Sequence, residues 1–207
     1  GGSDMSSIHT VIVPGVGGSE YEHWQSWLQR QLRSCSRVQQ TDWNMPILQE
    51  WIAQFVKTVS LHQESLQIVA HSFGCLTSIA ALAEYPELAH RIKNLVLVAP
   101  ANPERFGEAG FARNSQYNYA EYFQNLKIRV PAQLIISDND PWFKLEDAQF
   151  FANAWNLKPV SLGKVGHINV ASGFGPFPEI FDFLIAEKNS LNINITDNAE
   201  LFFRFAI

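Results

Sequence analysis

Apolar and polar residues follow two patterns along this chain: short continuous apolar runs, and longer stretches in which apolar residues recur every three or four positions. The short runs, rich in β-branched residues, predict strands within residues 9–15, 38–43, 66–70, 93–100, 132–138 and 158–163. The longer stretches predict helices within residues 20–32, 47–59, 75–86, 146–156 and 179–188. Strands and helices alternate, which predicts an α/β fold with a mostly parallel central sheet and helices on both faces.

Two segments do not follow this alternation. Residues 102–129 are polar and aromatic, and an insertion of this length between strands is typical of a functional loop that floors or covers a pocket. Residues 189–207 begin with an alternating pattern and end apolar, so they are expected either to pack back on the domain or to pair with another chain. Residues 1–4, ahead of Met5, resemble a cloning remnant, which leaves 5–188 as one expected domain.

Composition narrows the class of protein. With 46% apolar and 17% charged residues, the 207-residue chain has the composition of a globular domain with a continuous core. The net charge is -5 and Lys and Arg do not cluster, so neither nucleic acid nor a membrane is an expected partner. No apolar run reaches the ~18 residues of a membrane span. Cys35 and Cys75 match neither a disulfide framework nor a metal-ligand spacing, so a cytoplasmic protein without metal or cofactor is expected.

The most informative short motif is Ala-His-Ser-Phe-Gly at residues 70–74, between a predicted strand and a predicted helix. It matches the nucleophile elbow Gly-x-Ser-x-Gly, with Ala70 in place of the first glycine. Small residues two positions before and after the serine let the strand and the helix approach closely, and the hydroxyl stands clear of both. Ser72 is therefore a candidate nucleophile, and a plain turn is the alternative.

A serine nucleophile needs a base, and the base needs an acid that orients it. In α/β hydrolases the acid follows a later strand and the histidine follows the last one. Asp138 and Asp140 lie at the end of one predicted strand, and His167 follows the next. Since ligands of parallel sheets bind at the carboxyl ends of strands, all these residues belong to one expected site. The order selects His167 as the base and leaves both aspartates open as the acid.

The remaining histidines are weaker candidates for the base, because they lie at strand or helix ends or inside a helix. His71 is adjacent to Ser72, and adjacency is expected to point its side chain away from the hydroxyl. The others are His9, His23, His62 and His90.

An oxyanion hole needs two backbone N–H groups, one directly after the nucleophile and one from a loop after an early strand. Phe73 follows the serine and supplies the first. The second is expected from Val16, in the Pro-Gly-Val-Gly-Gly stretch at 14–18, because flanking glycines let the backbone turn its amide into the site. The same stretch does not fit a phosphate-binding loop, since no Lys-Ser/Thr pair follows it.

These motifs resemble the small α/β serine hydrolases that include retinoblastoma-binding protein 9 and the YdeN-like proteins. The likeness rests on PGVGGSEYEHWQSWL with its His-Trp-Gln triplet, and on AHSFGC, SDNDPW and VGHIN, and it spans residues 11–184. It implies an α/β-hydrolase fold with little or no cap. The acid of that family directly precedes a proline, which implies Asp140 rather than Asp138 and leaves Asp138 to cap the turn.

The expected function is that of a serine hydrolase, a carboxylesterase that forms an acyl-enzyme on Ser72 with small ester or related acyl substrates. Two alternatives stay open: a binding or scaffolding protein on a hydrolase fold, with a protein partner or homodimer, and an acyltransferase. Aromatic residues near the expected site could line an apolar pocket, or pack in the core. The candidates for the pocket are Trp24, Phe106 and Trp142.

Overall fold

The computed structural model describes residues 7–107 and 117–187, and within them six strands form one sheet. The strand order is β2-β1-β3-β4-β5-β6, and every neighbouring pair is parallel. The strands are β1 (Ile8–Val13), β2 (Cys35–Arg37), β3 (Ser65–His71), β4 (Ile92–Val98), β5 (Ala132–Ile136) and β6 (Pro159–Ser161). This sheet confirms the predicted α/β-hydrolase fold class.

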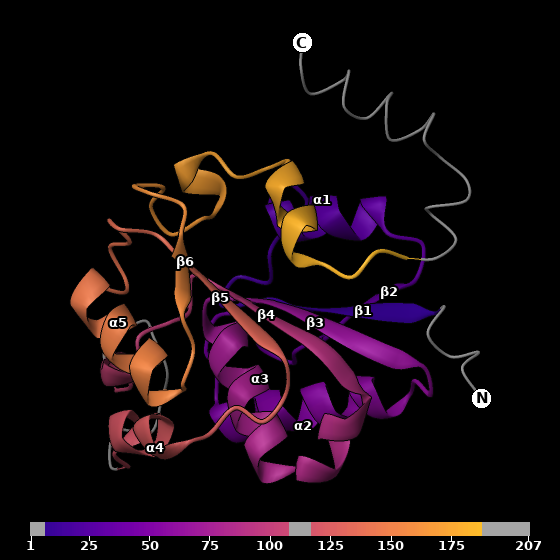
Figure 1. Ribbon diagram of the computed structural model, residues 1–207, viewed down its shortest axis with the longest axis horizontal. Helices are drawn as coiled ribbons and strands as arrows, with labels where there is room; N and C mark the ends of the chain where they lie inside the picture. The colour runs from indigo at the N-terminus through magenta and orange to yellow at the C-terminus, as the bar shows by residue number, and fades with distance from the viewer. Residues whose placement is uncertain (1–6, 108–116, 188–207) are drawn as a thin grey trace.

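Helices cover both faces of the sheet (Figure 1). One face carries α1 (Trp24–Gln31) and the 3-10 helix η5 (Pro178–Phe183). The other face carries α2 (Leu48–Ser60), α3 (Phe73–Glu84), α4 (Tyr119–Asn125) and α5 (Leu145–Ala154). Shorter 3-10 turns connect these elements: η2 (Pro86–Arg91), η3 (Pro103–Arg105) and η4 (Val170–Ser172).

The central strands read as continuous apolar runs because the sheet is buried on both sides. In β3, Ile68 and Ala70 belong to the core under α2 and α3, and Val69 between them belongs to the core under α1. All three side chains are fully buried. The pleat therefore alternates between two cores rather than between core and solvent.

The second predicted strand is wrong in position. It was expected at 38–43, and the structure places β2 at Cys35–Arg37. The Val38 N–H still bonds to the Ile12 carbonyl at 2.9 Å, and further along the predicted strand the Asp42 carboxylate accepts hydrogen bonds from the backbone N–H groups of Asn44 and Met45 and so closes a side-chain turn. A turn of that kind competes with strand pairing.

The last predicted helix is shorter and of a different type. The periodicity predicted a helix within 179–188, and the structure has only η5, after which the backbone is extended at Leu184. Pro178 occupies its first turn, where the missing N–H costs nothing. The helix then stops early because side chains of the sheet bind its carboxyl end.

Three amide side chains of the sheet hold that segment. Asn94 and Gln133 both donate to the Phe183 carbonyl oxygen, at 2.8 and 2.6 Å. The Gln67 amide donates to the Ile185 carbonyl at 3.0 Å and accepts from the Ile185 N–H at 2.9 Å. Backbone groups that would continue the helix are thus bonded to the sheet, and the segment runs extended.

Some expectations fall on residues that the structure does not describe. The 1–4 remnant, the 189–207 tail and the central part of the 102–129 insertion, residues 108–116, lie outside the described residues. The domain limits and the role of that insertion as a lid therefore stay predictions. Of the helices that are described, none has the length and apolar character needed to cross a bilayer.

Candidate active site

Ser72 occupies the sharp turn between β3 and α3. Its φ of +55° and ψ of -124° are strained for a residue with a Cβ, as the nucleophile elbow requires. The elbow packs closely against the end of β1 and the residues that follow it. A Cβ on Gly74 would lie 2.2 Å from the Val13 carbonyl oxygen, and one on Gly15 would lie 2.9 Å from the Cβ of Ser72. Both glycines are required by close approach, so the elbow motif has the physical basis that the sequence indicated.

The structure brings together the three side chains that the sequence singled out. The Ser72 hydroxyl lies 2.9 Å from Nε2 of His167, and Nδ1 of the same ring lies 2.9 Å from Oδ2 of Asp140. Asp140 is 6% exposed and His167 8%, so the hydrogen bond between them is shielded from water on most sides. Since a carboxylate only accepts, Nδ1 of His167 carries the hydrogen and Nε2 is free to accept the serine proton.

The two aspartates that the sequence left open have different surroundings. Asp140 contacts His167 and also accepts from the Trp142 N–H at 2.9 Å. Asp138 is exposed and accepts from the Ser161 hydroxyl at 2.6 Å. The expectation that Asp138 caps the turn is not met: the side-chain bond within the turn runs from the Trp142 N–H to Asp140, and Asn139 instead accepts from the Gly166 N–H at 2.9 Å, in the loop that carries His167.

The two expected oxyanion donors lie on adjoining loops. Phe73 is the first residue of α3, so its N–H is among those at a helix N-terminus that point at a developing anion. Gly15 lies against the elbow, since a Cβ on it would be 3.2 Å from the Phe73 nitrogen. Val16 follows directly and is 41% exposed at the rim. This placement is compatible with the predicted hole, whose donors stay a prediction.

Two further histidines surround the catalytic candidate. The ring of His71 lies 4.9 Å from that of His167 and 4.8 Å from that of His23. Burial, with added repulsion from Arg37 and His167, lowers the pKa of His23 to about 3. Burial also lowers the pKa of His71 well below its ordinary value, again with repulsion from the neighbouring imidazoles. Both rings are therefore neutral near pH 7.

These pKa shifts predict loss of stability in acid. Because His23 and His71 resist protonation only when folded, the unfolded chain binds more protons below pH 6.5. We expect the free energy of unfolding to be intact above pH 6.5 and to fall by about 1.4 kcal/mol per histidine for each pH unit below it. Urea unfolding at pH 7.0 and 5.5 measures the drop, and His23→Asn should reduce it by one histidine's share. If the free energy of unfolding of His23→Asn falls as much between the two pH values as that of the wild type, His23 is not one of the groups responsible.

Trp24 corrects the pocket prediction. It is fully buried in the core under α1, so it offers no surface to a substrate. Its indole N–H instead donates to the Ile168 carbonyl at 2.9 Å, next to His167. The other two pocket candidates lie on loops at the carboxyl edge of the sheet. Phe106 packs 5.6 Å from the ring of Phe73, and Trp142 is 48% exposed. Their role in binding stays a prediction.

The His-Trp-Gln triplet at the start of α1 has a structural explanation that sequence reasoning missed. Nδ1 of His23 caps the helix by accepting from the Gln25 N–H at 3.0 Å. Gln25 is fully buried, and its amide donates to the carbonyls of Val13 and Val69 in the two strands that flank the elbow. The sequence signal for this role was the run of polar and aromatic residues at the start of a helix, since an ordinary N-cap needs only one polar side chain.

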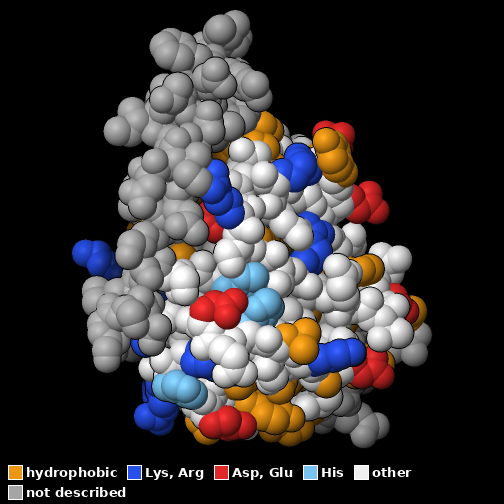
Figure 2. All heavy atoms as spheres, turned by 90° about the vertical axis from the view of Figure 1, so that its right-hand side faces the viewer, with side chains coloured by type: hydrophobic (Ala, Val, Ile, Leu, Met, Phe, Trp, Pro, Cys, Tyr) orange, Lys and Arg blue, Asp and Glu red, His pale blue; other side chains and the backbone are white. Residues whose placement is uncertain are grey.

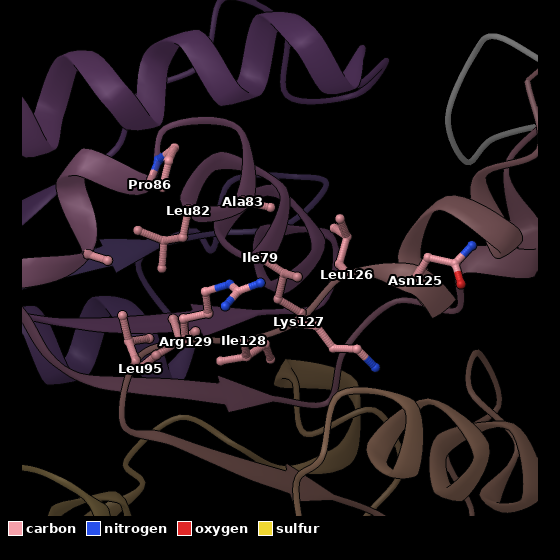
Figure 3. Close-up of a pocket in the computed structure, with 12 residues that line it drawn as sticks. Ile79, Leu82, Ala83, Pro86, Leu95, Asn125, Leu126, Lys127, Ile128 and Arg129 are labelled. Carbon is pink, nitrogen blue, oxygen red and sulfur yellow. The ribbon is translucent and has the colours of Figure 1, made fainter.

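The cavity drawn in Figure 3 is not part of this site. It has a volume of about 280 Å³ and lies between the second half of α3, η2 and the segment that leads into β5. Apolar side chains such as Ile79 and Leu82 line it, with Lys127 and Arg129 alongside (Figure 3). Ser72 precedes the first residue of α3, so the cavity is at the other end of that helix.

Histidine side chains also lie beside an acidic side chain on the face shown in Figure 2. In the described part of the chain, His9, His62 and Glu64 form a group of potential metal ligands. The two imidazoles are stacked at 3.9 Å, so their lone pairs run side by side rather than converging on one point. Their nitrogens bond to the hydroxyls of Ser34 and Ser36 and to Glu64. This is the geometry of a hydrogen-bonded pair, away from the carboxyl edge that carries Ser72.

A parallel sheet with a serine, a histidine and an aspartate at its carboxyl edge is the arrangement of an α/β hydrolase. The sequence profile described as serine hydrolase matches residues 10–186, and the chain belongs to this family. More particularly, it is 26% identical over 181 residues to the hydrolase YdeN of Bacillus subtilis strain 168, covering 84% of this chain and 92% of YdeN.

Solved structures agree with this placement. A YdeN-like hydrolase from Pectobacterium atrosepticum is 30% identical, with a TM-score of 0.70 over 86% of this chain and 90% of its own. Est1E of Butyrivibrio proteoclasticus, solved with ferulic acid bound, is 17% identical with a TM-score of 0.57, covering 79% of this chain and 82% of its own. The second likeness shows the fold alone. The expected resemblance to YdeN-like serine hydrolases is confirmed, and the protein is a hydrolase.

Proposed function

We propose that this hydrolase is a carboxylesterase that cleaves small esters through an acyl-enzyme on Ser72, with His167 as general base and Asp140 as the acid that orients it. The observation that carries the proposal is the pair of 2.9 Å contacts on opposite nitrogens of one imidazole, to Ser72 and to Asp140. Such a relay is what a weak hydroxyl nucleophile requires at neutral pH.

The proposed reaction uses these contacts in two steps. The Ser72 oxygen attacks the ester carbonyl carbon while Nε2 of His167 takes its proton, and the carbonyl oxygen becomes an oxyanion in reach of the Phe73 and Val16 amides. When the carbon–oxygen bond to the alcohol breaks, His167 returns the proton to the leaving alkoxide. A water molecule then attacks the acyl-enzyme, His167 takes the water proton and gives it to Ser72, and the carboxylic acid departs. Asp140 stays ionised and stabilises the imidazolium in both steps.

The surroundings of the serine support the proposed class of substrate. Phe106 and Trp142 place aromatic surface on the loops beside it, which favours an apolar acyl or alcohol group over a charged one. The guanidinium carbon of Arg105 lies 4.7 Å from the centre of the Trp142 ring, in a cation–π contact. The carboxylesterase CesB of Bacillus subtilis and Est1E share the fold, which is in keeping with an ester substrate without assigning one.

Purified protein tests the proposal directly. We expect turnover of p-nitrophenyl acetate and butyrate, and a mass increase on the peptide that contains Ser72 after incubation with a fluorophosphonate. Product analysis in the presence of excess alcohol separates hydrolysis from acyl transfer, since a transferase would give a new ester in place of the acid. A protein that takes up no fluorophosphonate and cleaves neither ester would refute the assignment.

A further inference from the structure

The loop that carries His167 has left-handed backbone on both sides of the histidine, which glycine adopts without strain and isoleucine does not. Gly166 and Ile168 both have positive φ, +64° and +50°. For Ile168, a β-branched residue, this conformation persists only where the surroundings impose it. The imidazole direction depends on this backbone, so whatever holds the loop also aims the base at Ser72.

Two buried side chains hold consecutive carbonyls of that loop. Nε2 of His71 donates to the carbonyl oxygen of His167 at 2.9 Å, and Nε1 of Trp24 donates to that of Ile168 at 2.9 Å. His71 is 4% exposed and Trp24 is fully buried, so water does not compete for either bond. The two donors come from different elements, β3 and the start of α1, and so fix the loop from two directions.

His71 has a second property that makes this tie effective. It is the last residue of β3 and is joined by one peptide bond to Ser72. Its hydrogen bond therefore couples the backbone of the base to the backbone of the nucleophile through a single buried side chain. A displacement of one by about 1 Å is enough to cost on the order of 100-fold in rate, which is why such a coupling matters.

The charge state of His71 suits the same role. A carbonyl oxygen only accepts, so Nε2 of His71 carries the hydrogen. The titratable groups that face it are His23 and His167, and Asp140 bonds to the far side of His167. Burial keeps the pKa of His71 well below its ordinary value, so the ring is neutral and does not oppose the positive charge that His167 acquires during acylation.

We propose that His71 and Trp24 are positioning residues, which hold the His167 and Ile168 carbonyls and thereby keep the base aligned with Ser72. Both side chains are buried, and their bonds act through the backbone of His167 and Ile168. The expected change in rate rests on the proposed function. The alignment of the His167 ring does not, because it is a property of the folded protein.

Four single variants of the full chain test this. His71→Gln keeps an N–H donor, and His71→Leu removes it at similar size. We expect His71→Leu to lower kcat by about 100-fold with KM within about threefold, and His71→Gln to stay within about tenfold of the wild type. Trp24→Phe, which removes the indole donor and keeps an aromatic ring, should lower kcat by about tenfold. His90→Gln, on an exposed histidine of η2, is the control and should leave kcat unchanged.

A readout independent of turnover accompanies the kinetics. The imidazole ¹H–¹⁵N spectrum should show His167 as a single tautomer with the hydrogen on Nδ1 in the wild type and His71→Gln, and as a tautomer mixture in His71→Leu. If the wild type proves inactive, the proposed function fails and this spectrum alone decides the positioning role. If His71→Leu does not fold, Trp24→Phe and His71→Gln carry the test. A variant that loses thermal stability while kcat and the His167 spectrum stay unchanged would overturn the inference.

Discussion

Replacing Ser72 by alanine should lower ester turnover by at least about 10⁵-fold, the loss seen when a serine nucleophile is removed from such a triad. The reason is geometric. The hydroxyl lies 2.9 Å from Nε2 of the base, and a methyl group at the same position can neither attack a carbonyl nor form the acyl-enzyme. Residual turnover from the oxyanion donors and substrate binding should remain above the uncatalysed rate.

The substitution should leave the fold intact. An alanine at this position would have the same Cβ and the same backbone strain as Ser72 at a φ of +55°, and the lost hydroxyl bond joins only the base. We therefore expect thermal unfolding within a few degrees of the wild type, and loss of fluorophosphonate labelling in the folded protein. Ser60→Ala, on an exposed serine at the end of α2, is the control and should be labelled like the wild type. Labelling that persists in the Ser72 variant would contradict the assignment of the nucleophile.

Asp140→Asn should lower kcat by about 10³- to 10⁴-fold with little change in KM. The carboxylate accepts the Nδ1 hydrogen of His167 and so leaves Nε2 free for the serine proton. An asparagine can turn its NH₂ toward Nδ1, which shifts the hydrogen to Nε2 and blocks proton transfer from Ser72. Shape and burial are nearly unchanged, so the effect isolates the tautomer.

Asp138→Asn is the matched control, since it makes the same change two residues away. Asp138 contacts Ser161 and not His167, and it is exposed. Asp138→Asn should keep kcat within about threefold of the wild type, because the side-chain oxygen of asparagine can still accept the hydrogen bond from the Ser161 hydroxyl. Comparing kcat of the two variants shows which aspartate is the acid, a question that the residue pattern alone left open. Equal losses would mean that the acid has been misassigned.

The strand and helix alternation was readable from the sequence because both faces of the sheet are buried. Runs such as residues 68–70 have no polar positions to obscure them. The predictions failed where a polar side chain bonds the backbone of another segment. Gln67 and Gln133 bond the backbone at and after the end of η5, and Asp42 closes a side-chain turn within the stretch predicted as the second strand. Local periodicity reports none of these side-chain bonds.

In the candidate site, too, local sequence features were predictable and contacts between distant segments were not. Ser72 and His167 were predictable because the elbow motif and the chain order are local and topological features. The His71 side chain was expected to point away from the Ser72 hydroxyl, but its contact with the His167 carbonyl, 96 residues away, could not be anticipated. Trp24 was a candidate both for a substrate pocket and for core packing, because an aromatic residue near a site suits either role, and only its burial in the core under α1 decides between them.

By itself, the sequence determined the order of strands and helices, the elbow and the residues from which a nucleophile and base would be drawn, since these depend on spacing along the chain. The tertiary structure decided which aspartate meets His167, which residues hold the loop of the base, and where the chain leaves the sheet. These depend on contacts between segments that only packing of the sheet brings within hydrogen-bond distance.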